Sequence, residues 1–157
     1  HMYGKVMLLC LFVALSLLIA GCQEKPKPTD QLQEYVDLWN KEKFEKMFTN
    51  YLNSSTKDTF KKEDFVTRYK DIYEDLEVKD VKVSFKKPEK EVDWDKESKA
   101  EFPLTISFNT LAGEVSYEKE ITLTKEKQGE EENWFIEWEP SYILPEMEKG
   151  DKVGVES

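Results

Sequence analysis

The sequence predicts an α+β fold in which helices come first and an antiparallel sheet follows. Apolar residues recur at spacings of three and four up to about residue 76, and from about residue 81 they alternate with polar residues. Each predicted strand has one apolar face, which the helices are available to cover. We therefore expect N-terminal helices packed on an antiparallel sheet of about four strands.

The first helical region is predicted from residue 30 to about residue 52, as one long helix or two collinear helices. Asp30 followed by Gln33 fits a capping box at its start. Residues 53–56 (NSST) read as a loop or a cap, and a second helix is predicted over about 61–76. The apolar positions at helical spacing are Leu32, Tyr35, Val36, Trp39, Phe44, Met47, Phe48 and Tyr51, then Phe65, Tyr69, Ile72, Tyr73 and Leu76.

The first two strands are predicted around residues 81–85 and 102–108, separated by a charged loop over 86–97. The sequence NTLAG, which ends at Gly113, supplies the residues of a hairpin turn.

A third strand is predicted over 115–123 and a turn over 127–133. The fourth strand carries Trp134, Ile136 and Trp138 on its inward face. Pro140 should end this strand, because proline has no N–H to donate to the ladder.

The first 22 residues predict a lipoprotein signal peptide. His1-Met2 is interpreted as a cloning remnant, and Lys5 precedes the apolar run 6–20. The run ends in Ile-Ala-Gly-Cys, which resembles a lipobox, so we expect lipidation of Cys22 after cleavage; the alternative is an ordinary signal with an incidental cysteine. Residues 23–29 (QEKPKPT) then form a polar tether.

Removal of residues 1–22 leaves 135 residues, enough for one domain, and changes the formal net charge from −10 to −11. This charge argues against nucleic acid and anionic membrane surfaces as partners. A lipidated Cys22 leaves no free thiol, and the only histidine is His1, so histidine triads and zinc sites are excluded. We expect no cofactor and no metal.

Several other features of the sequence match functional sites only in part or have more than one interpretation. Residues 54–57 (SSTK), 107–109 (SFN) and 127–129 (KQG) match or half-match the S-x-x-K, S-x-N and K-T-G set of penicillin-binding enzymes, but the serine would lie in a short polar loop. The acidic loop 93–97 lacks the glycine of a calcium site. Arg68, the single arginine, either holds an anionic ligand or pairs with a carboxylate or carbonyl under the sheet. The many aromatic residues form either the core or the lining of a ligand cavity.

Four segments, 35–48, 63–73, 109–123 and 134–153, resemble the MecA-type N-terminal domain of class B penicillin-binding proteins. The resemblance runs from about residue 30 to the end of the chain and favours the lipoprotein penicillin-binding protein 3 type of Bacillus-like Gram-positive bacteria. Its most specific part is W-x-I-acidic-W-x-P-S-x-I-x-P. The matching positions are Trp134, Ile136, Trp138, Pro140, Ser141, Ile143 and Pro145, with Arg68, Tyr69 and Gly113 in the other segments.

The resemblance implies a nuclear-transport-factor-2-like cone over residues 30–148, with 149–157 starting a linker to a missing C-terminal region. This domain is expected to be a non-catalytic, monomeric stalk on the outer face of the cytoplasmic membrane. Its expected partners are the protein's own C-terminal serine transpeptidase, the membrane through a lipid anchor, and nearby peptidoglycan. Roles in cell-wall synthesis and β-lactam resistance are expectations for the full-length protein.

Two other functions stay open at this point. A free-standing lipoprotein would use the cone as a small-ligand pocket. A dehydratase or isomerase would need an acid or base inside the cone, whereas the inward strand positions hold only Val, Ile, Leu, Phe, Tyr and Trp.

Overall fold

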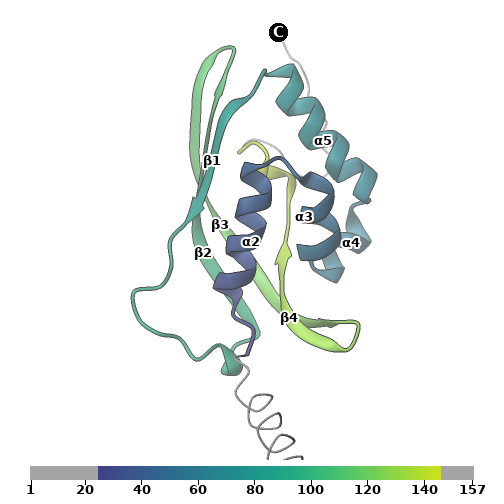
Figure 1. Ribbon diagram of the computed structural model, residues 1–157, viewed down its shortest axis with the longest axis vertical. Coiled ribbons are helices and arrows are strands. Elements are labelled where there is room, and N and C mark those ends of the chain that lie inside the picture. The colour runs from purple at the N-terminus through teal and green to yellow at the C-terminus, as the bar shows by residue number, and fades with distance from the viewer. Residues whose placement is uncertain (1–24, 146–157) are drawn as a thin grey trace, which may run out of the picture.

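The computed structural model describes residues 25–145 as four α-helices followed by one antiparallel sheet (Figure 1). The helices are α2 (Pro28–Asn40), α3 (Phe44–Tyr51), α4 (Ser54–Thr59) and α5 (Lys62–Asp75). The strands are β1 (Lys79–Phe85), β2 (Lys99–Thr110), β3 (Gly113–Gln128) and β4 (Glu131–Glu137), in the order β1-β2-β3-β4. Two short 3₁₀ helices are η1 (Trp94–Lys96) and η2 (Pro140–Tyr142). The predicted α+β class, helices first, is confirmed.

The first helix begins earlier than the sequence predicts. Its first residue is Pro28, which needs no N–H partner at this position, and Lys27 is the N-cap residue without a side-chain hydrogen bond. Asp30 therefore lies in the first turn, where its charge complements the helix dipole. The predicted capping box at Asp30 is wrong.

The helical region is also bent where a collinear continuation was one expectation. Between α2 and α3, Glu42 adopts a φ of +56°, a left-handed conformation that ends a helix. The chain then turns back, so that α3 lies beside α2 (Figure 1). Residues 54–59, expected to begin as a loop, form α4, while α5 agrees with the helix predicted over 61–76.

The strands extend beyond the apolar alternation that predicts them. Both hairpins close with two residues, 111–112 and 129–130, and Gly113 and Gly129 have φ of +116° and +78°. The turn predicted over 127–133 is therefore too long. Lys127 lies opposite Glu132 across the β3–β4 ladder, and this pair of opposite charges favours the extended hairpin.

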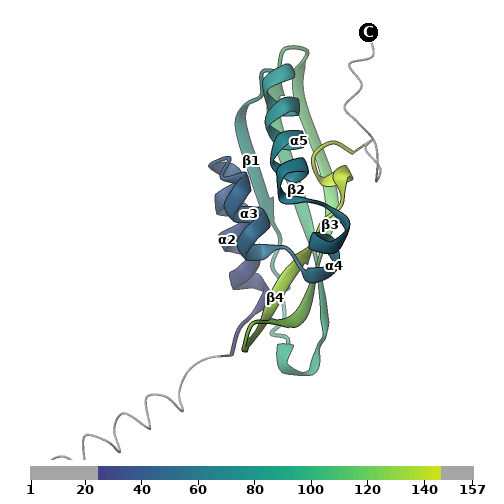
Figure 2. The same ribbon diagram turned by 90° about the vertical axis from the view of Figure 1, so that its right-hand side faces the viewer.

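The sheet is staggered and curves around the helices (Figure 2). One half of β2, from Leu104 to Asn109, pairs with β1, whereas β4 pairs with Thr122–Gln128 at the other end of β3. Near the start of β1 the register shifts at Asp80, which has a φ of +56°.

The concave side of the sheet is filled by side chains. Phe44 stacks on Tyr69 with ring centroids 4.6 Å apart, and Phe65 meets Trp138 edge-on at 4.8 Å. The indole N–H of Trp39 donates to the Tyr73 hydroxyl over 2.9 Å. The aromatic residues are thus packed core, as one of the two interpretations expected. Among the described residues, no helix is both long and apolar enough to cross a bilayer.

Candidate functional site

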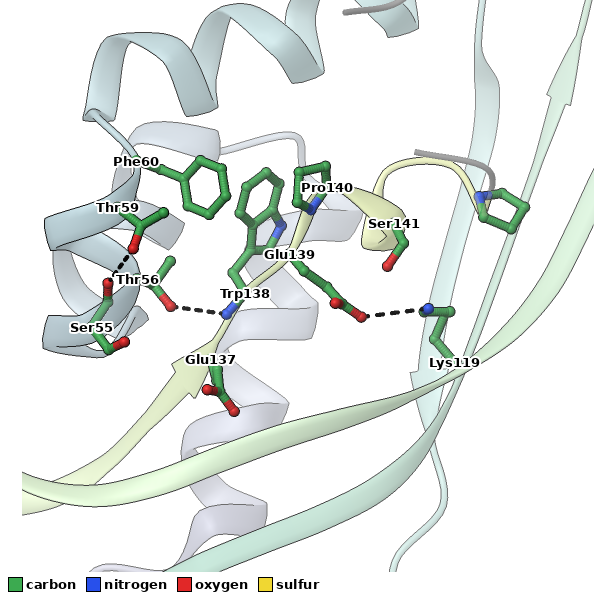
Figure 3. A pocket seen from close by; sticks show the side chains of 11 residues that line it. Ser55, Thr56, Thr59, Phe60, Lys119, Glu137, Trp138, Glu139, Pro140 and Ser141 are labelled. Carbon is green, nitrogen blue, oxygen red and sulfur yellow. Dashed lines mark hydrogen bonds and ion pairs between the residues drawn. The ribbon is translucent and has the colours of Figure 1, made fainter. Parts of the chain in front are cut away.

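A cleft of about 500 Å³ lies beside the end of β4, where the described chain leaves the sheet (Figure 3). One wall comes from α4 and Phe60, which follows this helix, and the other comes from Lys119 of β3 and the segment after β4. The cleft is bordered by Ser55, Thr56, Thr59, Phe60, Lys119, Glu137, Trp138, Glu139, Pro140, Ser141 and Pro145.

A buried polar network joins α4 to the end of β4. Asn53 caps α4, because its side-chain oxygen accepts from the backbone N–H of Thr56 over 2.9 Å and from the Thr56 hydroxyl over 2.6 Å. The same hydroxyl accepts from the backbone N–H of Trp138 over 3.0 Å. The backbone N–H of Asn53 also donates to the carbonyl of Ile136, beside a parallel bridge between Leu52 and Ile136. This network fixes α4 as one wall of the cleft.

Trp138 forms the apolar floor between the two walls. Its ring meets Phe60 edge-on at 5.0 Å, and its indole N–H donates to the Tyr69 hydroxyl over 3.2 Å. Trp134 and Ile136, which precede it on β4, are fully buried.

The chain is held in a defined direction after Trp138. Pro140 starts η2, and the Tyr117 hydroxyl lies 2.8 Å from the carbonyl oxygen of Tyr142 and 2.6 Å from that of Ile143. Ile143 is fully buried, whereas Pro145, the last described residue, is exposed. Tyr117 thereby ties the exit segment to β3.

The charges around the cleft belong to exposed or half-buried side chains. Lys119 pairs with Glu139 over 3.5 Å. Burial raises the pKa of Tyr117 and of Tyr142 well above the ordinary tyrosine range. The Ser141 hydroxyl is buried and has no hydrogen-bond partner among residues 25–145. Within this described part, no cluster of three potential metal ligands occurs. Thr56, Lys119 and Glu139 at the cleft are thus engaged in contacts within the fold.

Comparison with known proteins identifies the family of this domain. The profile of the family described as "NTF2-like N-terminal transpeptidase domain" (MecA type) matches residues 27–151. The chain belongs to this family. It is 35% identical over 144 residues to penicillin-binding protein 3 of Bacillus subtilis strain 168, covering 91% of this chain and 21% of that protein. The MecA-type resemblance and the nuclear-transport-factor-2-like fold are thereby confirmed, and the chain spans about a fifth of the relative's length.

The residues matched to the MecA-type motif are divided between the cleft and other places. Trp138, Pro140, Ser141 and Pro145 border the cleft, and Trp134, Ile136, Ile143 and Tyr69 are core residues. Gly113 lies in the β2–β3 turn, where its φ of +116° favours glycine. Cys22 lies outside the described residues.

Two roles were expected for Arg68, binding of an anionic ligand or pairing with a carboxylate or carbonyl. Its guanidinium carbon lies 5.8 Å from the centre of the Phe60 ring, a cation–π contact. Its Nη1 is buried without a hydrogen-bond partner within residues 25–145. Within residues 25–145 the Arg68 guanidinium thus contacts Phe60, which borders the cleft, and both roles expected for Arg68 stay predictions.

The three motifs shared with penicillin-binding enzymes do not form one site in this domain. The Ser54 hydroxyl donates to Glu126 over 2.6 Å, and the Lys57 ammonium donates to the carbonyl of Thr49 over 2.8 Å. Ser107 lies opposite Ser116 on β3. Lys127 is eleven positions further along β3, roughly 35 Å away at the usual rise of a strand. Ser54 opens α4 rather than lying in a loop, yet the rejection of this site stands.

Sequence reasoning missed Asn53, Thr56 and Tyr117 as residues that shape the cleft. The first two lay in a segment interpreted as a loop or a cap, although Asn followed by Ser-Ser-Thr is a common helix start. Tyr117 was expected only as an inward strand residue. Its hydroxyl partners are backbone carbonyls, which leave no signal in the sequence.

Proposed function

We propose that this MecA-type domain is the non-catalytic stalk of a lipid-anchored penicillin-binding protein in cell-wall synthesis. In this proposal, Cys22 anchors it to the outer face of the cytoplasmic membrane. The protein's own C-terminal transpeptidase, beyond the present chain, is raised towards peptidoglycan. Cross-linking, and any binding of β-lactams, belongs to that C-terminal region, and the stalk works as a monomer.

The observation that carries the proposal is the route of the chain through the domain. The described chain begins at the lower end of the molecule and leaves in its upper half, after β4 and η2 (Figure 1). Tyr117 and Thr56 fix the exit at two places by hydrogen bonds. A domain that receives the chain at one end and releases it in a fixed direction has the properties of a spacer.

The filled interior supports a spacer more than a ligand-binding lipoprotein. Trp39, Phe65, Tyr69 and Phe102, which would line a cavity inside the cone, are fully or almost fully buried against one another and their neighbours. The 500 Å³ cleft lies beside the exit instead.

Acylation by a fluorescent penicillin tests the absence of catalysis. We expect no covalent label on this chain under conditions in which the full-length protein is labelled once per molecule. Ser54→Ala is the matched control, because Ser54 is the serine of the S-x-x-K match and should leave the result unchanged. A label on this chain that disappears in Ser54→Ala would overturn the proposal.

A further inference from the structure

The segment between β1 and β2 lies at the end of the molecule where the described chain begins (Figures 1 and 2). Lys25 pairs with Asp95 of η1 over 3.0 Å, which ties the start of the described chain to this segment. The Lys125 ammonium donates to the carbonyl of Trp94 over 2.7 Å. The Trp94 ring packs on Trp134, with centroids 5.8 Å apart. The segment therefore has a fixed position on the sheet.

Four exposed lysines gather at this end without ion-pair partners among the described residues. Of the five carboxylates in residues 86–97, Asp93 pairs with Lys96 and Asp95 with Lys25, whereas Glu89, Glu91 and Glu97 have no ion-pair partner among the described residues. We name the four lysines the lysine patch: Lys27, Lys86, Lys87 and Lys90. Three of them, Lys27, Lys87 and Lys90, border a shallow cleft of about 290 Å³ together with Thr29 and Glu91.

The patch has an apolar neighbour. Val92 borders the same cleft and is 39% exposed, and it is one of two large apolar side chains exposed among residues 25–145. The other, Leu111, lies in the β2–β3 turn at the opposite end of the molecule (Figure 1). Lysines beside an exposed apolar side chain suit the interface of a bilayer, where ammonium groups meet phosphates and a small apolar group reaches the glycerol region.

The covalent length of the chain brings this end to the bilayer. Only three peptide steps separate Cys22 from Lys25, and an extended chain covers at most about 3.5 Å per residue, so Lys25 lies within about 11 Å of the lipidated residue. This step rests on the proposed anchor at Cys22. Given that anchor, the lysine patch reaches the layer of lipid headgroups.

We propose that the lysine patch binds the phosphate groups of anionic phospholipids beside the anchor, so that the domain stands with this end on the membrane. The net charge of −11 predicts repulsion from an anionic surface only for the chain as a whole. The Debye length is about 10 Å at 0.1 M salt, so acidic residues at the far end contribute little at the surface. Residues 86–97 together with Lys25 and Lys27 hold six lysines against five carboxylates, so this end carries a net charge of +1 and is not repelled as the whole chain is. The lysines that face the headgroups orient the domain.

A site-specific label tests the contact with the protein anchored artificially. Residues 23–157 are used, because every residue of the core cluster lies between Leu32 and Ile143. An N-terminal hexahistidine holds the protein on nickel-chelating lipid, in vesicles of phosphatidylcholine with or without phosphatidylglycerol. An environment-sensitive fluorophore is attached at Val92→Cys or, as a control, at Leu111→Cys, each the single thiol of its protein.

We expect the label at position 92 to shift to the blue and become quenched by headgroup-attached quenchers only when phosphatidylglycerol is present, and the label at 111 to stay unchanged. An unchanged signal at 92, or an equal change on phosphatidylcholine alone, would overturn the proposal. Complete loss of the signal with millimolar inorganic phosphate at constant ionic strength would show a free-anion site instead.

Charge-matched variants separate the patch from net charge. Each lysine near an anionic surface changes binding about fivefold, so Lys86→Gln, Lys87→Gln and Lys90→Gln together should weaken binding of the unanchored domain to phosphatidylglycerol vesicles roughly 100-fold. Lys41→Gln, Lys43→Gln and Lys46→Gln make the same change in charge around the α2–α3 turn and should have little effect. Equal losses in the two triple variants would contradict a local site.

The proposed anchor is tested independently of the patch. Because the chelating lipid replaces Cys22, a negative result on vesicles removes the membrane contact and leaves the stalk proposal intact. Incorporation of labelled lipid into the wild-type protein in cells, compared with Cys22→Ala, tests the anchor itself. A wild-type protein without label would defeat the anchored stalk whatever the vesicles show.

Discussion

The Thr56 hydroxyl, beside the cleft at the end of β4, is buried and depends on the hydrogen bonds that it makes within the fold. The Thr56 hydroxyl both donates to Asn53 and accepts from the backbone N–H of Trp138, and Thr56 is 4% exposed. A buried donor left without an acceptor costs more than the net contribution of an average hydrogen bond. Removing the Thr56 hydroxyl should therefore destabilise the fold by more than the loss of one average hydrogen bond.

Thr56→Val tests this role, because valine keeps the shape of threonine and removes the hydroxyl. We expect the free energy of unfolding to fall by about 1–3 kcal/mol, since the backbone N–H of Trp138 loses its partner. Urea denaturation followed by tryptophan fluorescence measures the change. Thr59→Val is the control, because the Thr59 hydroxyl donates to Ser55 in an exposed turn of α4, and its cost should stay below about 0.5 kcal/mol. Equal costs would contradict the role given to Thr56.

Predictability from the sequence differs sharply between residues of the same site. The burial of Trp134, Ile136 and Trp138 follows from their alternation along one strand, and the structure buries all three. The contact between Arg68 and Phe60 could not be predicted, because it depends on where α4 ends relative to α5. Local pattern gives the direction of a side chain, but its partner comes from the packing of elements.

At the scale of elements, the shortest ones shape the cleft and are the least visible in the sequence. The six residues of α4 are too few to show a helical period, and isolated helices of this length are unstable without tertiary contacts. η2 is a single turn that begins with Pro140. Contacts with β4 and β3 stabilise both elements, so their existence depends on a sheet that forms far along the chain.

Tyr117→Phe tests whether β3 holds η2 through the tyrosine hydroxyl. We expect a loss of about 1 kcal/mol in the free energy of unfolding, as for an average hydrogen bond. Amide exchange should rise at Ile143, whose N–H donates to Pro140 within η2. The amide of Leu123 in the middle of the sheet is the internal control and should exchange at the unfolding-limited rate. Unchanged protection at Ile143 would show that packing alone fixes the exit.

At the scale of the whole molecule, the sequence predicts the order and faces of the elements better than their ends. Apolar alternation stops near Leu123, yet β3 continues to Gln128 through charged residues. Glu42 turns the chain with a positive φ, although no glycine in the sequence marks this turn. The turn makes α2 and α3 neighbours instead of one long helix. Both differences arise from backbone geometry, which the periodicity of apolar residues does not predict.

The buried tyrosines of the whole core predict unfolding at alkaline pH. Burial raises the pKa of five tyrosines above the ordinary value of 10: Tyr35, Tyr69, Tyr73, Tyr117 and Tyr142. The folded-state pKa values of these tyrosines exceed the unfolded-state values. Their contribution to the free energy of unfolding is therefore complete below pH 10 and is lost as the pH rises. Each costs about 1.4 kcal/mol per pH unit in that range, so the fold should be lost roughly between pH 11 and 12.

Tyrosinate absorbance and far-ultraviolet circular dichroism, recorded together, check the alkaline transition. Both signals should change in one step, because the buried tyrosines ionise only on unfolding. Partial burial, and then the Glu34 carboxylate, raise the pKa of Tyr51 to about 12, but this residue is at the surface of the fold. Tyr51→Phe should raise the midpoint by only about a few tenths of a pH unit, because it removes one of six such contributions and solvent screening weakens that one. Ionisation of several tyrosines in an intact fold would refute the assignment.

The neighbourhood of α2 and β4 has a mechanical consequence. The first described helix and the last strand lie side by side and run in the same direction, and the Gln31 amide donates to the carbonyl of Trp134 over 3.1 Å (Figure 1). Tension applied between Lys25 and Pro145 would slide α2 along β4 and strain many contacts simultaneously, instead of peeling them off one by one. The β2–β3 hairpin lies outside this line of force. In the proposed role, a pull between membrane and wall would meet resistance first at the contact between α2 and β4.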